Sequence, residues 1–162
     1  TDLATHDIDI VQYILGQEPT RIYSETQNTY HKKEDLMSAV IRFKNGTIGL
    51  IEVSWLHPTK IRSLTVLGEN GMYVADYITQ ELFFYRQNEN LFGNNIFPTS
   101  ITQADVVKIA FQAKEPLQIE LESFVRAVIA KSKMPVTAED GLSALIMAEK
   151  MIASGKNHKI LK

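Results

Sequence analysis

Hydrophobic residues follow a helical period at both ends of the chain and an alternating period between them. Apolar residues recur at helical spacing up to Leu15, and Gly16 ends the helix that this spacing predicts. The chain between residues 21 and 86 alternates and is rich in β-branched and aromatic residues, which predicts strands. Turn signals such as Asn45-Gly46 and Glu69-Asn70-Gly71 separate the strands. The predicted strands span residues 21–30, 36–43, 47–56, 61–67, 72–77 and 81–86, with one more at 105–111.

Two further helices are predicted near the C-terminus. Pro116 opens a helix over residues 117–131, whose apolar side chains are expected to be buried. Thr137 is placed as the N-cap of the next helix, with Asp140 in the capping-box position. Gly155 is expected to close that helix.

The order of helix, antiparallel strands and two helices predicts an α+β fold in one domain spanning residues 1–162. We expect a large, open, mainly antiparallel sheet with the helices packed on one face. Residues 87–104, rich in Asn and Gln, are predicted to form a long surface loop. The second sheet face has no cover within the chain. An apolar sheet face of this kind implies a partner, most simply further copies in a homodimer or homotetramer.

Composition excludes several classes of function. The net charge is −2, so the chain has no excess of basic residues, and nucleic acid is not an expected partner. The absence of cysteine excludes disulfides, thiolate metal sites and a cysteine nucleophile, and it suits a cytoplasmic location. No apolar run approaches the roughly 20 residues needed to cross a membrane. His31, His57 and His158 lack paired ligand spacing, so no metal site is expected.

The first helix carries the candidate chemistry. Asp2 and His6 are four residues apart, so a helix places them one turn apart on one face. A carboxylate beside an imidazole can act as a tuned general base. The simpler alternatives are a solvent-exposed histidine in the first turn and an aspartate that caps the helix. Asp9 lies near the same face, either as a hydrogen-bond partner for a substrate or as a surface acid.

Several segments together resemble the glucose–fructose oxidoreductase and inositol dehydrogenase (Gfo/Idh/MocA) family. The opening Asp2-Leu-Ala-Thr-His6-Asp-Ile-Asp9 looks like the central helix of that family. Similar stretches follow at residues 11–16, 46–55, 115–124 and 135–142. Members have an N-terminal Rossmann domain, with a Gly-rich fingerprint and a Glu-Lys-Pro lysine, and a C-terminal α+β domain. This chain contains neither motif and therefore resembles the C-terminal domain alone, with the dinucleotide-binding domain missing.

The resemblance implies an oxidoreductase that oxidises a hydroxyl of a sugar, nucleotide sugar or polyol with NAD or NADP, bound mainly by the missing domain. His6 would be the general base, Asp2 would orient it and Thr5 would lie near the cofactor. The isolated chain is expected to be inactive. The stretch over residues 54–62 is similar to UDP-N-acetylglucosamine 3-dehydrogenases and their relatives.

Three more residues are candidates for substrate binding. Trp55 offers a flat platform for a sugar, although a lone tryptophan is also a common core residue. Lys60 and Arg62 could neutralise a diphosphate, or they could form the solvent face of a strand. Two non-enzymatic hypotheses also fit the sequence. One is a sugar-binding or dimerisation module without catalysis, and the other is a scaffold that binds another protein through its sheet.

Overall fold

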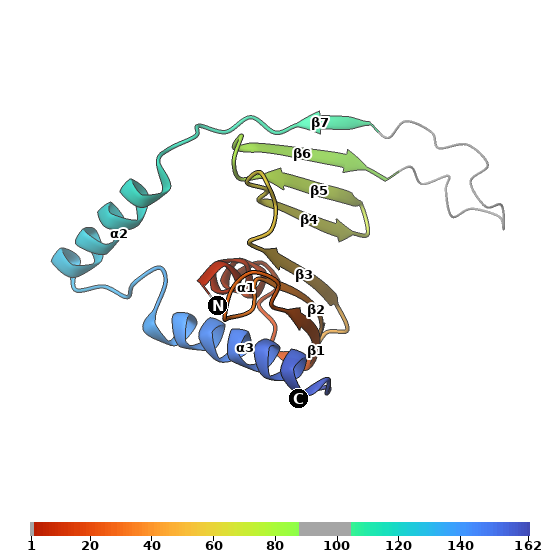
Figure 1. The fold of residues 1–162 in the computed structure, drawn as a ribbon. Coiled ribbons are helices and arrows are strands. Elements are labelled where there is room, and N and C mark those ends of the chain that lie inside the picture. The colour runs from red at the N-terminus through yellow and green to blue at the C-terminus, as the bar shows by residue number, and fades with distance from the viewer. Residues whose placement is uncertain (1, 88–104) are drawn as a thin grey trace. The chain divides into compact units, whose positions relative to one another are not determined.

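The computed structural model of the chain describes residues 2–87 and 105–162, with side chains from residue 4 onward (Figure 1). It confirms the predicted α+β class and the order of elements. The helices are α1 (Asp2–Leu15), α2 (Pro116–Ala130) and α3 (Ala138–Asn157). The strands are β1 (Pro19–Gln27), β2 (Leu36–Phe43), β3 (Ile48–Ser54), β4 (Ser63–Gly68), β5 (Gly71–Asp76), β6 (Glu81–Arg86) and β7 (Val106–Lys108).

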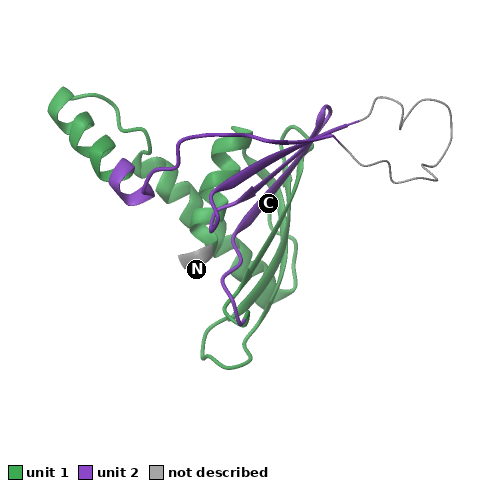
Figure 2. Ribbon diagram, turned by 90° about the horizontal axis from the view of Figure 1, so that it is seen from above, with its two compact units in different colours: residues 1–57, 120–162 green, residues 58–119 purple. Residues whose placement is uncertain are grey.

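The chain divides into two compact units (Figure 2). Unit 1 comprises residues 1–57 and 120–162, and unit 2 comprises residues 58–119. The strands are correspondingly divided between two antiparallel sheets, β1-β2-β3 in unit 1 and β4-β5-β6-β7 in unit 2. Residues 88–104, which make up nearly all of the predicted surface loop, lie outside the described residues. None of the described helices is long and apolar enough to cross a membrane.

The sheet of unit 1 is built from strands whose side chains alternate between a buried and an open face. On β2, Met37, Ala39, Ile41 and Phe43 are buried, while the residues between them are exposed. The predicted Asn45-Gly46 turn joins β2 to β3, and the N–H of Gly46 donates to the carbonyl of Phe43 at 3.0 Å.

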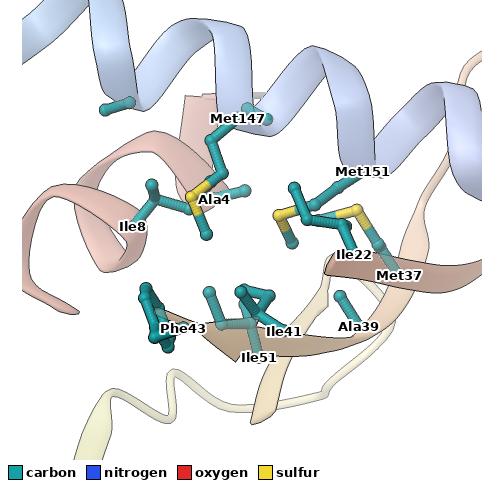
Figure 3. Packing of buried hydrophobic residues seen from close by; sticks show 12 residues of the cluster. Ala4, Ile8, Ile22, Met37, Ala39, Ile41, Phe43, Ile51, Met147 and Met151 are labelled. Atoms are coloured by element: carbon teal, nitrogen blue, oxygen red, sulfur yellow. The ribbon is translucent and has the colours of Figure 1, made fainter. Parts of the chain in front are cut away.

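Helices α1 and α3 cover the buried face of this sheet (Figure 3). The core contains Ile8 of α1, Met147 and Met151 of α3, and Ile41 and Phe43 of β2, each at most 2% exposed. Figure 3 shows the two methionine side chains reaching from α3 towards the sheet. Removing this much apolar surface from water is the main force that holds the two helices on the sheet.

Residues at the edge of β1 form hydrogen bonds with the C-terminal segment and with α3. Ile22 and Leu161 exchange two backbone hydrogen bonds, of 2.8 and 2.9 Å. The N–H of Ser24 donates to Oγ of Ser154 at 3.1 Å, and the Ser24 hydroxyl donates to the carbonyl of Met151. These bonds occupy backbone groups that would otherwise offer a template for another strand.

The start of α3 agrees with the sequence prediction, but its end does not. Thr137 is the N-cap and forms the full capping box with Asp140. The helix continues past Gly155 to Asn157, and His158 forms a left-handed C-cap. Gly155 is instead buried against β1, where a Cβ atom would lie 2.6 Å from Cγ2 of Thr26. The absence of a side chain at Gly155 therefore lets α3 pack closely against β1, and this glycine does not end the helix.

The expected burial of α2 is also wrong in this structure. Among the residues of this helix, only Ala127 is buried. Its larger apolar side chains are between 42% and 77% exposed: Leu117, Ile119, Leu121, Phe124, Val125, Val128 and Ile129. The sequence period identifies an apolar helix, but it does not identify a surface that covers the helix.

Candidate functional site

His6 lies on the outward face of α1. The inward face is formed by residues at helical spacing, and Ala4 and Ile8 on it are at most 1% exposed. His6 is two positions from each of them, and each residue turns the helix by about 100°, so it lies roughly half a turn away from the core. Its side chain is exposed accordingly. The imidazole is therefore accessible and is not packed under the sheet.

The other candidate residues of α1 surround this outward face. Thr5 and Asp9 are half-buried at its borders. Tyr13, two turns beyond His6, is 86% exposed and was not among the sequence candidates. Asp2 opens the helix, but its side chain lies outside the described part of the chain. The contact between Asp2 and His6 therefore stays a prediction.

A small hollow lies beside the N-terminal end of α1, within unit 1. It has a volume of about 30 Å³. That volume admits about two water molecules and not a sugar ring. The lining residues are Ala4, Glu34, Asp35, Leu36, Met37, Val53, Trp55, Ala148 and Ile152.

Trp55 stands at the end of β3 and lines this hollow. Its side chain is 61% exposed, which contradicts the interpretation of the tryptophan as a core residue. The N–H of Trp55 donates to the carbonyl of Asp35 at 2.8 Å, which fixes the backbone from which the indole projects. The exposed indole suits contact with a flat ligand or with another protein surface.

Asp35 organises the loop between β1 and β2. It is 1% exposed, and its carboxylate accepts backbone N–H bonds from Tyr30 at 2.8 Å, Thr29 at 2.9 and 3.0 Å and His31 at 3.3 Å. The bonds from Tyr30, Thr29 and His31 hold the pKa of Asp35 below its usual value. The sequence pattern does not predict this role of Asp35. Its only signal was an acidic residue at the end of a polar segment between two strands.

A second polar contact joins the same loop to α3. Nζ of Lys156 lies 2.8 Å from Oε1 of Glu34, whose side chain is 20% exposed. The hydrogen bond from Lys156 lowers the pKa of Glu34. Neither residue was a sequence candidate. Together with Asp35 they hold the loop that borders the hollow.

Lys60 and Arg62 differ from the sequence prediction in their secondary structure. Strand β4 begins at Ser63, so both residues lie in the segment that precedes it and not on the solvent face of a strand. Both side chains are exposed and belong to unit 2. Their predicted role in binding a diphosphate stays a prediction.

The described residues contain no group of three histidine or acidic side chains that could hold a metal ion. The chain also has no Gly-x-Gly-x-x-Gly turn to cradle a pyrophosphate. What the arrangement offers chemically is the accessible imidazole of His6 on α1, with the half-buried Thr5 and Asp9 on the same helix. Such a group can accept a proton from a substrate that reaches the outward face of α1.

Comparison with known proteins defines the family. The model of the oxidoreductase family, C-terminal alpha/beta domain (GFO_IDH_MocA_C), matches residues 1–162. This chain therefore belongs to the Gfo/Idh/MocA oxidoreductase family and corresponds to its C-terminal domain.

Individual relatives are distant in sequence but similar in fold. The chain is 22% identical over 161 residues to myo-inositol 2-dehydrogenase of Thermotoga maritima, an alignment covering 90% of this chain and 43% of the relative. The structure of UDP-N-acetylglucosamine 3-dehydrogenase GnnA from Acidithiobacillus ferrooxidans is 17% identical, with a TM-score of 0.80 over 93% of this chain and 45% of that one. The WlbA dehydrogenase from Bordetella pertussis, solved with NADH and UDP-GlcNAcA, is 18% identical, with a TM-score of 0.68 over 98% and 43%. The chain thus spans less than half the length of these relatives.

Proposed function

We propose that this chain is the substrate and oligomerisation domain of a cytoplasmic NAD(P)-dependent dehydrogenase that oxidises a hydroxyl of a sugar, nucleotide sugar or polyol. The observation that carries this proposal is the exposed imidazole of His6 on the outward face of α1, in a chain of the Gfo/Idh/MocA family. In this proposal the chain works together with a dinucleotide-binding domain and is inactive without it.

His6 acts as the general base in the proposed reaction. Oxidation of an alcohol releases a hydride from carbon and a proton from oxygen, and the imidazole takes that proton. A positioned base of this kind contributes about 10²–10⁴-fold to the rate. Asp2 orients the imidazole, and Asp9, half-buried one turn further along α1, accepts a hydrogen bond from a second substrate hydroxyl.

In this proposal, the residues of this chain make only a few of the contacts to a nicotinamide cofactor. When bound, the nicotinamide accepts the hydride released from carbon. Thr5, half-buried in the first turn of α1, is the residue of this chain that would lie near such a group in this proposal. The remaining contacts, and the choice between NAD and NADP, belong to the dinucleotide-binding domain in this proposal.

A nucleotide sugar is the substrate class that accounts for the largest number of candidate residues. In unit 1, the exposed indole of Trp55 offers a platform for a sugar or base ring. In unit 2, taken by itself, Lys60 and Arg62 offer positive charge for a phosphate group. The names of two structural relatives support this choice, since GnnA is a UDP-N-acetylglucosamine dehydrogenase and WlbA was solved with UDP-GlcNAcA.

The proposal is tested in a polypeptide that contains both this chain and a dinucleotide-binding domain. Nucleotide sugars and polyols are screened with NAD and NADP, and nicotinamide absorbance is followed. On the best substrate, His6→Ala should lose at least about 100-fold in kcat. His31→Ala, a histidine in an exposed loop, serves as the matched control and should keep the wild-type rate. An undiminished rate for a folded His6→Ala variant would refute the assignment.

A further inference from the structure

The loop that joins β1 to β2, residues 28–35, is exposed at its tip but held from below by a buried charge. The Asp35 carboxylate, 1% exposed, accepts backbone N–H bonds from three consecutive residues of the loop. The N–H of Asp35 donates to the carbonyl of Gln27 at 3.0 Å. A buried carboxylate is costly unless it is hydrogen-bonded, as it is here. The backbone of this loop is therefore fixed although the tip, residues 30–33, is exposed to solvent.

Two large aromatic side chains project from backbone that Asp35 holds. The N–H of Tyr30 donates to its carboxylate and the N–H of Trp55 donates to its carbonyl, both at 2.8 Å. Tyr30 is 81% exposed and Trp55 is 61% exposed. An exposed aromatic ring on a fixed backbone suits stacking on a flat ligand, because little conformational freedom is lost when the ligand binds.

The tip of the loop also carries two lysines that are available to an anion. Lys32 and Lys33 are exposed, and neither forms an ion pair with another described residue. The two acids that follow them are already engaged. Glu34 pairs with Nζ of Lys156 at 2.8 Å, and Asp35 is occupied by backbone N–H groups. The positive charge at the tip is thus not neutralised by its acidic neighbours in the sequence.

We propose that this loop and Trp55 form a binding site for the nucleoside diphosphate part of a nucleotide substrate. The ammonium groups of Lys32 and Lys33 bind the phosphates. The rings of Tyr30 and Trp55 contact the base, because every nucleobase offers a flat π-face for stacking. A free sugar or polyol has neither an aromatic ring nor a negative charge, so it would leave both pairs of side chains unused.

The site lies at the end of unit 1 where α1 begins. Ala4, in the first turns of α1, lines the same small hollow as Asp35 and Trp55. His6 follows two residues later on the outward face of that helix. A nucleotide bound at the loop is therefore held at the end of the unit that carries the proposed general base.

This inference rests on the choice of a nucleotide sugar within the proposed function and adds the residues that bind its nucleotide part. Its test measures ligand binding and not turnover. A polyol dehydrogenase that uses His6 as its base would survive failure of this inference. Conversely, the loop could bind a nucleotide even if His6→Ala left the rate unchanged.

Calorimetry with uridine 5′-diphosphate (UDP) as the probe tests the site. The protein is the polypeptide that contains this chain and a dinucleotide-binding domain, saturated with NAD or NADP so that the cofactor site is filled. Lys32→Glu/Lys33→Glu should raise the Kd for UDP at least about tenfold, because charge-assisted hydrogen bonds to the phosphates are lost. The Kd for uridine, which has no phosphate, should change less than about twofold. Lys44→Glu is the matched control, since Lys44 is exposed in the turn after the opposite end of β2.

Two substitutions at Tyr30 test the aromatic half of the site. Tyr30→Ala should weaken the binding of both UDP and uridine at least about fivefold, because a stacking ring is lost. Tyr30→Phe keeps the ring and should bind UDP like the wild type. Inorganic pyrophosphate, which has no base, should bind more weakly than UDP. Far-UV circular dichroism verifies the fold of each variant.

Five results would each overturn the proposal. The first is a wild type that does not bind UDP at millimolar concentration. The second is a lysine double variant that binds UDP normally, and the third is one that loses uridine as strongly as UDP. The fourth is an equal loss in Lys44→Glu, which would indicate a general effect of charge. The fifth is pyrophosphate binding as tight as that of UDP, or a Tyr30→Ala variant with unchanged affinity, since either removes the role of the aromatic rings.

Discussion

Replacing Gly155 with alanine tests how closely α3 approaches β1. The added Cβ atom would lie 2.6 Å from Cγ2 and 2.9 Å from Oγ1 of Thr26. Gly155 is buried, so the strand or the helix must move to admit the new methyl group. Overpacking of a filled core site costs about 1–3 kcal/mol.

Helix propensity acts in the opposite direction. Alanine stabilises a helix interior by about 1 kcal/mol relative to glycine. A contact as short as 2.6 Å puts the overpacking cost in the upper part of its range. We therefore expect Gly155→Ala to lower the free energy of unfolding by about 1–2 kcal/mol.

The same helix contains a matched control. A Cβ added at Gly141, in the early part of α3, would meet no atom within 4 Å. Gly141→Ala should therefore raise the free energy of unfolding by about 0.5–1 kcal/mol, because only the propensity changes. Urea unfolding followed by circular dichroism measures both variants.

A second substitution isolates the contact. Thr26→Ala removes the two nearest atoms, and the third nearest, Cβ of residue 26, lies 3.2 Å from the added methyl group. In this background Gly155→Ala should cost close to nothing, which a double-mutant cycle would report as a coupling energy. If Gly155→Ala is as stable as Gly141→Ala, or if Thr26→Ala brings no relief, the close approach is refuted.

Three further predictions concern the core, the cap and the acid stability of unit 1. Ile8→Ala should lower the free energy of unfolding by about 2–5 kcal/mol, since Ile8 is 0% exposed, whereas Ile14→Ala, at a position 46% exposed, should cost much less in the same urea assay. Thr137→Ala should cost about 1 kcal/mol by removing the N-cap of α3, and Thr137→Ser should recover most of it. The pKa of Asp35 is lowered in the folded chain, so its stabilising effect is present above the ordinary aspartate pKa of about 3.9 and is lost as pH falls through the lower folded value. Urea midpoints measured from pH 7 to pH 3 should thus fall more steeply in the wild type than in Asp35→Asn, and equal slopes would contradict the hydrogen bonds assigned to this carboxylate.

Local sequence signals predicted the elements of unit 1 well. The apolar spacing of α1 and its stop at Gly16, where φ is 57°, depend only on neighbouring residues. The same holds for the Asn45-Gly46 turn and for the capping box of Thr137 and Asp140. These features are local because their hydrogen bonds join residues within a few positions of one another.

Features that depend on distant partners could not be predicted in this way. The role of Gly155 depends on Thr26, which lies on the first strand, and the exposure of Trp55 depends on where the core ends. The division of the strands into two sheets depends on which strands pair with each other, and an alternating pattern does not encode the partner of a strand. For the candidate site, the sequence suggested His6, whose catalytic role stays a prediction. It gave no signal for the accessible position of Tyr13 on the same helix or for the loop that Asp35 organises.

The central claim is that His6 removes a proton from the substrate hydroxyl. Chemical rescue of His6→Ala by added imidazole tests it most directly, in the polypeptide that carries both domains and with the substrate found by screening. Because His6 is exposed on α1, a small base can reach the place that its side chain vacates. Our account predicts that kcat of the variant is low and rises with imidazole concentration, while the wild-type rate stays constant. A His6→Ala variant that turns over at the wild-type rate, with no response to imidazole, would contradict it.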